Sequence, residues 1–308
     1  MSELHTIIVE SATRLDQLLV AKWGSLGRRQ IREMVTGGAV SVNGRSAQNV
    51  GQRLNAGDQV LVELPALSSE AVVSAPPGLA LSVVYEDEAL LVVDKPAGIP
   101  VRPSRKRDRA AVTELLAAMY PEQAHVGGAD RAGVVTMLGE DVSGLLLAGR
   151  DEGTYRELRR LVKRHYVQEV YTALVEGHLR GEFTIDQPIG NVKRARERLA
   201  VAREGRPART LVRGQQHLKE SGRDYTVVYV RPETARMHQI RVHLAWHGFP
   251  IVGDRVYGTK RQTMLPDRVF LHLSEMRLPQ PSSGDEIRVE SPLPPELYSL
   301  LTYMRRPK

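Results

Sequence analysis

A segment rich in serine, alanine and proline constrains the fold of this chain more than any other feature. Residues 68–80 read SSEAVVSAPPGLA and follow the period of neither a helix nor a strand. Adjacent prolines interrupt helices and inner strands, because proline has no backbone N–H and a fixed φ. We therefore expect a linker here, between one domain at residues 1–67 and another at 81–308. A chain of 308 residues is long enough for two domains.

The composition is that of a globular, mildly basic protein. Hydrophobic residues make up 42%, enough for packed cores, and 43 Lys and Arg outnumber 36 Asp and Glu. A positive balance suits a polyanionic partner but does not require one. The absence of cysteine excludes disulfides and thiolate metal sites, and no apolar run approaches the roughly 20 residues of a membrane span. The N-terminus does not resemble a signal peptide, so we expect a cytoplasmic protein that contacts no membrane.

The first part of the chain predicts two short helices followed by a β-hairpin. Leucines at helical spacing follow Thr13, a candidate N-cap, and Gly24 should end that helix. A second helix is expected over residues 28–36. Asn43-Gly44 is a preferred sequence for a tight hairpin turn, and QVLVEL at 59–64 alternates as a last strand.

The second part predicts an α+β fold. Strand patterns outnumber helical patterns and do not alternate regularly with them, which favours a mixed, mainly antiparallel sheet over a doubly wound one. Helices are expected at residues 111–119, 152–163 and 238–246. Strands are expected at 81–87, 89–95, 144–148, 171–175, 225–230 and 288–290.

Three arginines should lie on the outer face of the second predicted helix. Ile31 and Val35, four residues apart, should face the core, so Arg28, Arg29 and Arg32 should point outward. An outward row of arginines can bridge phosphates or stack on unpaired bases. A solvated charged face would have the same composition, so charge alone leaves both interpretations open.

A resemblance narrows this choice. The pattern RLDQLL…GRRQIREMVTGGAVSVNG…GDQV, over roughly residues 13–64, resembles the alpha-L RNA-binding domain named after a small-subunit ribosomal protein. In that family the second helix and the turn before it contact RNA. The resemblance therefore implies RNA binding by Arg28, Arg29 and Arg32, with Lys22 and Arg45 as further candidates.

Four later stretches, in order, resemble the RluA branch of the pseudouridine synthases. They read VVYEDEALLVVDKPAGIPV, RAGVVTMLGEDVSGLLLAGR, VYTALVEG and ETARMHQIRVHLAWHGFPIVGDRVYG, and they span most of residues 83–258. That family isomerises uridine in RNA to pseudouridine, on a base flipped out of the RNA, with no cofactor and no metal. The resemblance implies a structured RNA as partner, ribosomal RNA first of all, and we expect a monomer.

The second stretch departs from the family where the catalytic string H-R-L-D should stand. The flanks RAGVV and SGLLL fix the register. The family's His then falls on Thr136, its flipping Arg on Met137, its Leu on Leu138 and its catalytic Asp on Gly139. Glycine supplies neither a nucleophile nor a base, so the resemblance implies an RNA-binding protein that has lost its isomerase activity.

Two neighbouring acids leave an alternative open, an active synthase in which Glu140 or Asp141 replaces the missing carboxylate. Active relatives commonly carry an acid at the position of Asp141 as well, which indicates another role for it. Glu140 should point away from the site if the segment is extended. Since catalytic geometry fails at misplacements of about 1 Å, we prefer the non-catalytic hypothesis. A pure protein-interaction scaffold is a third possibility, and it would not bind RNA.

The resemblance also implies a uridine pocket. Tyr171 matches the tyrosine that stacks on the base, and Arg241 matches the residue that pairs with the catalytic Asp. His238 and Gln239 should complete the wall, with His238 making a structural hydrogen bond. Without a carboxylate at residue 139, Arg241 is expected to pair with one of the two neighbouring acids or with an RNA phosphate, because an unpaired buried guanidinium is costly.

No motif predicts a metal or a nucleotide cofactor. HExxH, GxGxxG and P-loop strings are absent, and His238 and His243 lie too far from i, i+4 spacing to share a helical face. Two basic segments remain, at residues 104–109 and 193–213. In the resembled family, insertions near these positions enclose the RNA. A basic hairpin that only faces solvent would have the same kind of sequence.

Overall fold

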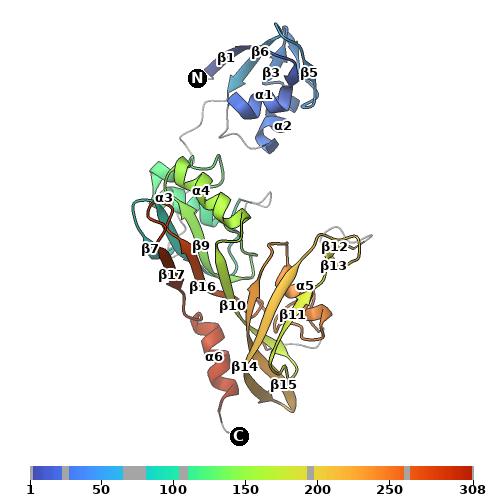
Figure 1. The fold of residues 1–308 in the computed structure, drawn as a ribbon, viewed down its shortest axis with the longest axis vertical. Helices are drawn as coiled ribbons and strands as arrows, with labels where there is room; N and C mark the ends of the chain where they lie inside the picture. Colours follow the sequence, from blue (N-terminus) through green and yellow to red (C-terminus); the bar gives the residue numbers. More distant parts are fainter. Residues whose placement is uncertain are drawn as a thin grey trace.

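Two separate main hydrophobic cores form in this chain. The computed structural model describes residues 3–22, 28–64, 81–103, 110–192, 198–259 and 264–306. One core lies within residues 9–62 and the other within residues 81–304 (Figure 1). The predicted linker at 68–80 and the basic loop at 104–109 lie outside the described residues, so the linker remains a prediction.

The N-terminal core packs two helices against a small antiparallel sheet, which confirms the predicted order of helix, helix and hairpin. The sheet has the order β1-β6-β3-β4, and a two-stranded pair, β2 and β5, lies beside it. Leu15, Leu19, Ile31 and Val35 are buried between helices and sheet. The bounds are β1 (Glu3–Ile8), β2 (Thr13–Arg14), α1 (Leu15–Lys22), α2 (Arg28–Thr36), β3 (Val40–Val42), β4 (Arg45–Ser46), β5 (Arg53–Leu54) and β6 (Gln59–Leu64).

One local prediction in this part is wrong. Thr13 is not the N-cap of α1, because it pairs with Leu54 in the short β2–β5 ladder. The hairpin turn is as expected. Asn43 and Gly44 both have positive φ, 49° and 76°, which is the conformation that an Asn-Gly turn favours.

The second core surrounds a nine-stranded sheet of the predicted mixed type. Its order is β11-β14-β15-β10-β16-β9-β8-β7, with β17 paired to β16. Among the strands that the structure describes in this sheet, only β9 and β16 run parallel. The bounds are β7 (Ser82–Glu86), β8 (Leu90–Lys95), β9 (Ser143–Gly149), β10 (Gln168–Glu176), β11 (Glu182–Asp186), β14 (Arg209–Glu220), β15 (Arg223–Pro232), β16 (Leu271–Pro279) and β17 (Glu286–Glu290).

The parallel pair is the crowded centre of this sheet. Every residue of β9 is buried, as expected for a strand with both faces covered. Gly144 has φ 119° and lies directly against the backbone of Leu273, so a Cβ at this position would clash with β16. This glycine therefore lets β9 enter the sheet, immediately after the segment that carries Gly139.

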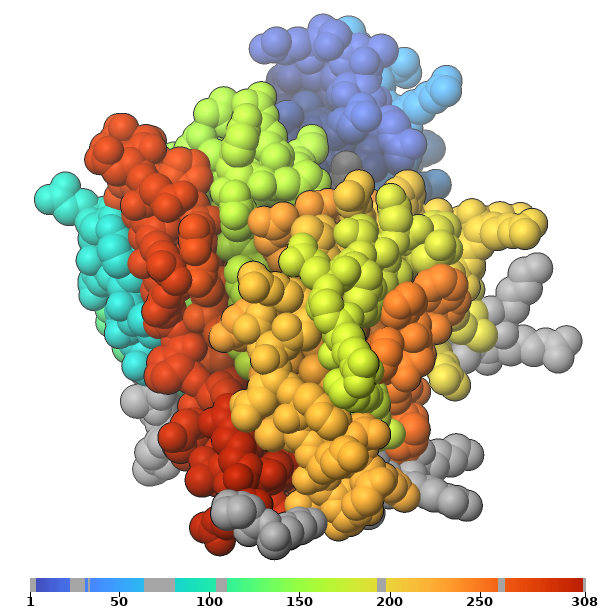
Figure 2. Space-filling view, turned by 60° about the horizontal axis from the view of Figure 1, so that its bottom comes forward, coloured from blue at the N-terminus to red at the C-terminus, as the bar shows by residue number. Residues whose placement is uncertain are grey.

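Among the described residues, four helices pack around this sheet. The pattern-predicted helices are present as α3 (Val112–Met119), α4 (Glu152–Lys163) and α5 (Gln239–Trp246). α4 begins at Asp151, whose carboxylate accepts a hydrogen bond from the N–H of Thr154 at 2.9 Å. A fourth helix, α6 (Pro295–Met304), is not predicted from the sequence and packs next to β14 (Figures 1 and 2).

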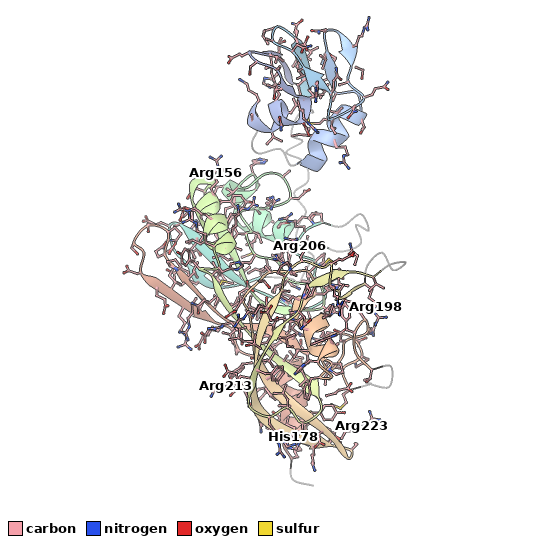
Figure 3. All side chains as sticks on the ribbon, turned by 45° about the vertical axis from the view of Figure 1, so that its right-hand side comes forward. Arg156, His178, Arg198, Arg206, Arg213 and Arg223 are labelled. Carbon is pink, nitrogen blue, oxygen red and sulfur yellow. The ribbon has the colours of Figure 1, made fainter. Side chains whose placement is uncertain are left out.

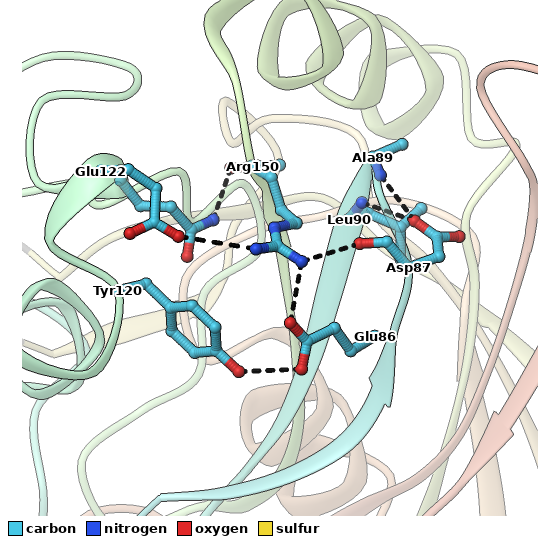
Figure 4. Close-up of polar contacts among 9 residues, drawn as sticks. Glu86, Asp87, Ala89, Leu90, Tyr120, Glu122 and Arg150 are labelled. Atoms are coloured by element: carbon cyan, nitrogen blue, oxygen red, sulfur yellow. Dashed lines mark hydrogen bonds and ion pairs between the residues drawn. The ribbon is translucent and has the colours of Figure 1, made fainter.

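A polar network holds one edge of the sheet (Figure 4). Arg150, directly after β9, donates to Glu86 at 2.8 Å and to the carbonyl of Asp87 at 3.1 Å. Tyr120 donates to the other oxygen of Glu86 at 3.0 Å. These contacts join the ends of β7 and β9 to the segment after α3.

Candidate functional site

The predicted pocket is a cavity of about 630 Å³, within the usual range for small-molecule sites. Its walls come from the segment before β9, from the chain between α4 and β10, and from the end of β15 with the start of α5. Tyr171, Arg241, His238 and Gln239 all line it, together with Gly139. The four residues that the resemblance assigns to one pocket therefore lie around one cavity.

Gly139 begins a tight turn rather than an extended segment. The N–H of Val142 donates to the carbonyl of Gly139 at 3.1 Å. Glu140 and Asp141 at the corner of this turn are exposed, and neither lines the cavity. The expectation of an extended segment is thus wrong, because the chain reverses here before it enters β9.

Space for a side chain exists at position 139. A Cβ built on Gly139 would meet only the Cγ2 of Val142, at 3.4 Å, which is an ordinary van der Waals contact. The φ of Gly139 is also outside the left-handed region. Neither the packing nor the backbone therefore requires glycine at this position.

Lys95 holds this turn in place through its side-chain hydrogen bonds. The sequence did not predict it as a site residue. Its side chain is fully buried, and its Nζ donates to the carbonyls of Pro96 at 2.8 Å, Ile99 at 2.9 Å and Glu140 at 3.1 Å. Burial, more than the nearby Arg268, lowers the pKa of Lys95 to about 8. The backbone at Glu140 is therefore held by a buried cation at the end of β8.

The partner expected for Arg241 is wrong. Its Nε and Nη2 donate to the two oxygens of Asp254, both at 2.7 Å. Asp254 is buried and also accepts the N–H groups of Val256 and Tyr257 at 2.9 Å each. These contacts to Arg241 and the backbone keep the pKa of Asp254 low although burial acts in the opposite direction. Asp254 belongs to the sequence GFPIVGDRVYG, within the fourth stretch that resembles the family. The sequence alone did not indicate that Asp254 pairs with Arg241.

Tyr257 is the hydrogen-bond partner of His238. The Tyr257 hydroxyl accepts the N–H of Leu199 at 3.2 Å and lies 3.0 Å from Nδ1 of His238. Burial, and then the positive charge of Arg241, lower the pKa of His238. Both effects favour the neutral ring, and the expected structural hydrogen bond of His238 is present.

The amide of Gln239 is committed to the fold. Its Nε2 donates to the carbonyl of Arg209 and to the hydroxyl of Thr210, both at 2.9 Å, and its Oε1 accepts from Thr234 at 2.8 Å. Both amide N–H groups are thereby used to join α5 to β14, and the oxygen is bonded to Thr234 in the loop after β15. Gln239 shapes the wall without offering its amide to a ligand.

A carboxyl group that the sequence analysis did not single out also lines the cavity. Glu169 lies two residues before Tyr171 on β10, and the Tyr171 hydroxyl donates to its Oε2 at 2.9 Å. Burial raises the pKa of Glu169, against the opposing effect of the Tyr171 hydrogen bond. Burial also raises the pKa of Tyr171, so its hydroxyl keeps its proton.

The candidate RNA-binding residues of the N-terminal part are exposed where their side chains are described. Lys22 ends α1, Arg32 lies on α2 and Arg45 on β4, and all three face solvent. Arg28 and Arg29 belong to α2, but their side chains lie outside the described residues. The structure therefore places three of the five on exposed surface and the other two on the predicted helix.

The basic segment at 193–213 is divided between a hairpin and a long strand. β12 (Ile189–Asn191) and β13 (Leu199–Val201) form the hairpin, whose tip at 193–197 lies outside the described residues. Arg198 and Arg206 lie on this side of the molecule, whereas Arg213 lies well away on β14 (Figure 3). The described arginines of this segment therefore do not form one continuous surface.

One further cluster could hold a metal ion by its composition. His178, His217 and Asp224 bring their donor atoms within 4.8 Å of one another, on the surface and away from the cavity lining. The two imidazoles stack at 3.8 Å, and His217 bonds Asp224 at 2.8 Å. Arg180 and Lys219 contact the same cluster, and their positive charges oppose the binding of a metal cation there.

Within the described part of the chain, no helix has the length and apolar character needed to cross a membrane.

Comparison with known proteins gives a family. Residues 89–246 match the model of the RNA pseudouridylate synthase family, and residues 13–60 match the S4 domain. An uncharacterized RNA pseudouridine synthase of Bacillus subtilis, YlyB, is 33% identical over 96% of both chains. The ribosomal large subunit pseudouridine synthase D of Escherichia coli K12 is 32% identical over 95% of this chain and 90% of its own.

A solved structure agrees with these matches. Human RNA pseudouridylate synthase domain containing 1 superimposes with a TM-score of 0.60 and 26% identity, over 73% of this chain and 90% of its own. The chain belongs to the RNA pseudouridylate synthase family, in its RluA branch, and carries an S4 domain at its N-terminus.

Proposed function

We propose that this chain is a non-catalytic member of its family, which binds a structured RNA through its S4 domain and its cavity without isomerising uridine. The named large-subunit relatives suggest large-subunit ribosomal RNA as the partner. Arg28, Arg29, Arg32, Lys22 and Arg45 would contact its phosphates. The protein would act in the cytoplasm as a monomer.

The observation that carries this proposal is the absence of a side chain at residue 139. The family's chemistry begins with a carboxylate placed at the glycosidic bond, and the register of the quoted motif puts Gly139 at that position. Glu140 and Asp141 are exposed at the corner of the turn, outside the cavity lining. Since a misplacement of about 1 Å already disables a catalytic group, exposed neighbours are poor replacements.

The buried charges of the cavity support the same conclusion. Arg241 is fully paired with Asp254, so it does not depend on a carboxylate at residue 139. The cavity can therefore persist as a binding site when the catalytic group is absent. A nucleotide held there would be bound by contacts to Tyr171 and the surrounding wall alone.

The test is a direct search for the product. Purified protein is incubated with unmodified large-subunit ribosomal RNA, and pseudouridine is mapped by chemical labelling and mass spectrometry. We expect RNA binding with no pseudouridine above the protein-free control. Pseudouridine formed by the unaltered chain would overturn the proposal, and its loss in Glu140→Gln or Asp141→Asn would identify the active alternative.

Gly139→Asp provides a matched variant for this test. The space around Gly139 accepts a Cβ, so the variant should fold and bind RNA as the parent does. Its melting temperature should lie within about 3 °C of the parent, because substitutions that create no clash usually change stability by about 1 kcal/mol or less. A variant that fails to fold would show that residue 139 must remain glycine for structural reasons.

A further inference from the structure

Glu169 is the only carboxylate among the described residues that line the cavity. It is the second residue of β10 and stands two residues before Tyr171, so the two side chains project from the same face of the strand. The Tyr171 hydroxyl reaches back along the strand and donates to Glu169 at 2.9 Å. The carboxyl group therefore lies at the far end of the Tyr171 ring.

This position decides which part of a ligand meets the carboxyl group. A planar base that stacks on the Tyr171 ring extends beyond the ring's edge, toward the group to which the hydroxyl donates. The edge of the base, rather than its face, would then contact Glu169. Edges differ between the four bases, whereas faces are alike, so Glu169 is placed where bases can be distinguished.

Among the residues that the structure describes, none places a positive charge beside Glu169. Within the described part of the chain, its one hydrogen bond is the one from Tyr171. The two arginines that line the cavity have other partners, since Arg241 pairs with Asp254 and Arg236 donates to the carbonyls of Pro207 and Ala235. A half-buried carboxylate with a single neutral donor is costly, which agrees with the raised pKa of Glu169.

We propose that Glu169 selects the base that the cavity holds and favours guanine over uracil. This inference rests on the proposed function, namely that the cavity binds an unpaired nucleotide. Guanine presents two adjacent donors, N1–H and the N2 amino group, to the two oxygens of a carboxylate. Uracil presents a single N3–H between two carbonyl oxygens, and these would face the negative charge of Glu169.

Glu169→Gln is the discriminating variant, because it keeps the size of the side chain and changes its hydrogen bonding. A glutamine amide offers one acceptor and one donor, which complement N3–H and O4 of uracil. The same amide turns a donor toward one of the two donors of guanine. The substitution should therefore reverse the preference of the cavity rather than abolish binding.

The experiment measures calorimetric binding of guanosine and uridine 5′-monophosphates to the full chain at pH 8. We expect the unaltered protein to bind the guanosine nucleotide at least about tenfold more tightly, since a bidentate pair supplies roughly 1–3 kcal/mol of discrimination. Glu169→Gln should bind the uridine nucleotide more tightly than the guanosine nucleotide. Thermal unfolding of both proteins checks that the variant is folded.

Three results would overturn the proposal. They are tighter binding of uridine monophosphate by the unaltered protein, an unchanged preference in Glu169→Gln, and no binding of either nucleotide at millimolar concentration. None of these results depends on pseudouridine formation, which tests the proposed function separately. Tyr171→Ala serves as a control, because it removes the ring on which either base would stack and should weaken binding of both nucleotides.

Discussion

At the scale of single residues, several side chains of the cavity wall have their charge or hydrogen-bonding groups paired within the protein. Arg241 has Asp254, His238 is neutral, and Gln239 has no free amide position. Two side chains with shifted ionisation are Glu169, with its raised pKa, and Lys95, with its lowered one. Perturbed groups of this kind often mark functional sites, and here one faces the cavity while the other supports its turn.

Lys95 leads to a prediction about stability and pH. Its pKa is about 8 in the folded protein and 10.5 in an unfolded chain, so between these values the unfolded state binds more protons. The free energy of unfolding should therefore rise with pH through this window. From pH 7.5 to 9.5 the gain from Lys95 alone is about 2 kcal/mol, calculated from the linkage relation.

Urea unfolding of the unaltered protein and of Lys95→Met at both pH values provides the measurement. Lys95→Met should be less stable by about 2 kcal/mol at pH 9.5, because the neutral amine still donates to two of the three carbonyls and methionine donates to none. The difference between the two proteins should be smaller at pH 7.5. Parallel pH profiles would show that Lys95 does not change its charge in this range.

At the scale of elements, Tyr257 couples the β12–β13 hairpin to the cavity. Its hydroxyl accepts from Leu199 on β13 and shares a hydrogen bond with His238 at the start of α5. Arg241 and Arg198 both lie over its ring, at 5.3 and 6.0 Å from the centroid. One side chain thus contacts a strand of the basic hairpin and the wall of the pocket.

Tyr257→Phe tests this coupling. Removing the hydroxyl should cost about 1–2 kcal/mol, since a backbone N–H and a histidine nitrogen lose their partner. The amide of Leu199 should exchange its hydrogen faster, and the pKa of His238 should change when followed by NMR. Tyr85→Phe is the matched control, because its hydroxyl bonds Asp87 on the opposite side of the sheet. Equal effects of both variants on Leu199 would contradict the coupling.

Some helices and strands could be predicted from the sequence and others could not. Helices with a strong apolar stripe, such as α4, were predicted within a residue or two, and so was the Asn-Gly hairpin. β14 was not predicted, because its second half, GQQHLKE, carries polar residues on a half-exposed strand. The pairing of Arg241 with Asp254 was missed because 13 residues of loop and helix separate the two in sequence, and only the fold brings them together.

At the scale of the whole molecule, the proposed RNA contacts are divided between an S4 domain and a synthase domain. If Lys22, Arg32 and Arg45 contact phosphates, each replacement by alanine should lower the slope of log affinity against log salt by about one. Filter binding from 50 to 300 mM salt would measure this slope. Nucleotide binding in the cavity should be unchanged by these substitutions.

Arg14→Ala is the control for that series. Arg14 is on the same part of the chain, but its guanidinium pairs with Asp16 at 2.9 Å. Its loss should therefore change the slope less than loss of Arg32 does. Equal slopes for all four variants would locate the phosphate contacts elsewhere, for example on the β12–β13 hairpin.

The pairing of Arg241 with Asp254 has a consequence for how such a protein can arise. In a site where a buried arginine is balanced only by the catalytic carboxylate, deleting that carboxylate leaves an uncompensated charge and destabilises the fold. Here the balance is supplied by an acid 13 residues further along, together with two backbone N–H groups. A carboxylate at residue 139 is therefore not needed to neutralise Arg241, so its loss leaves no unpaired charge in the wall of the cavity.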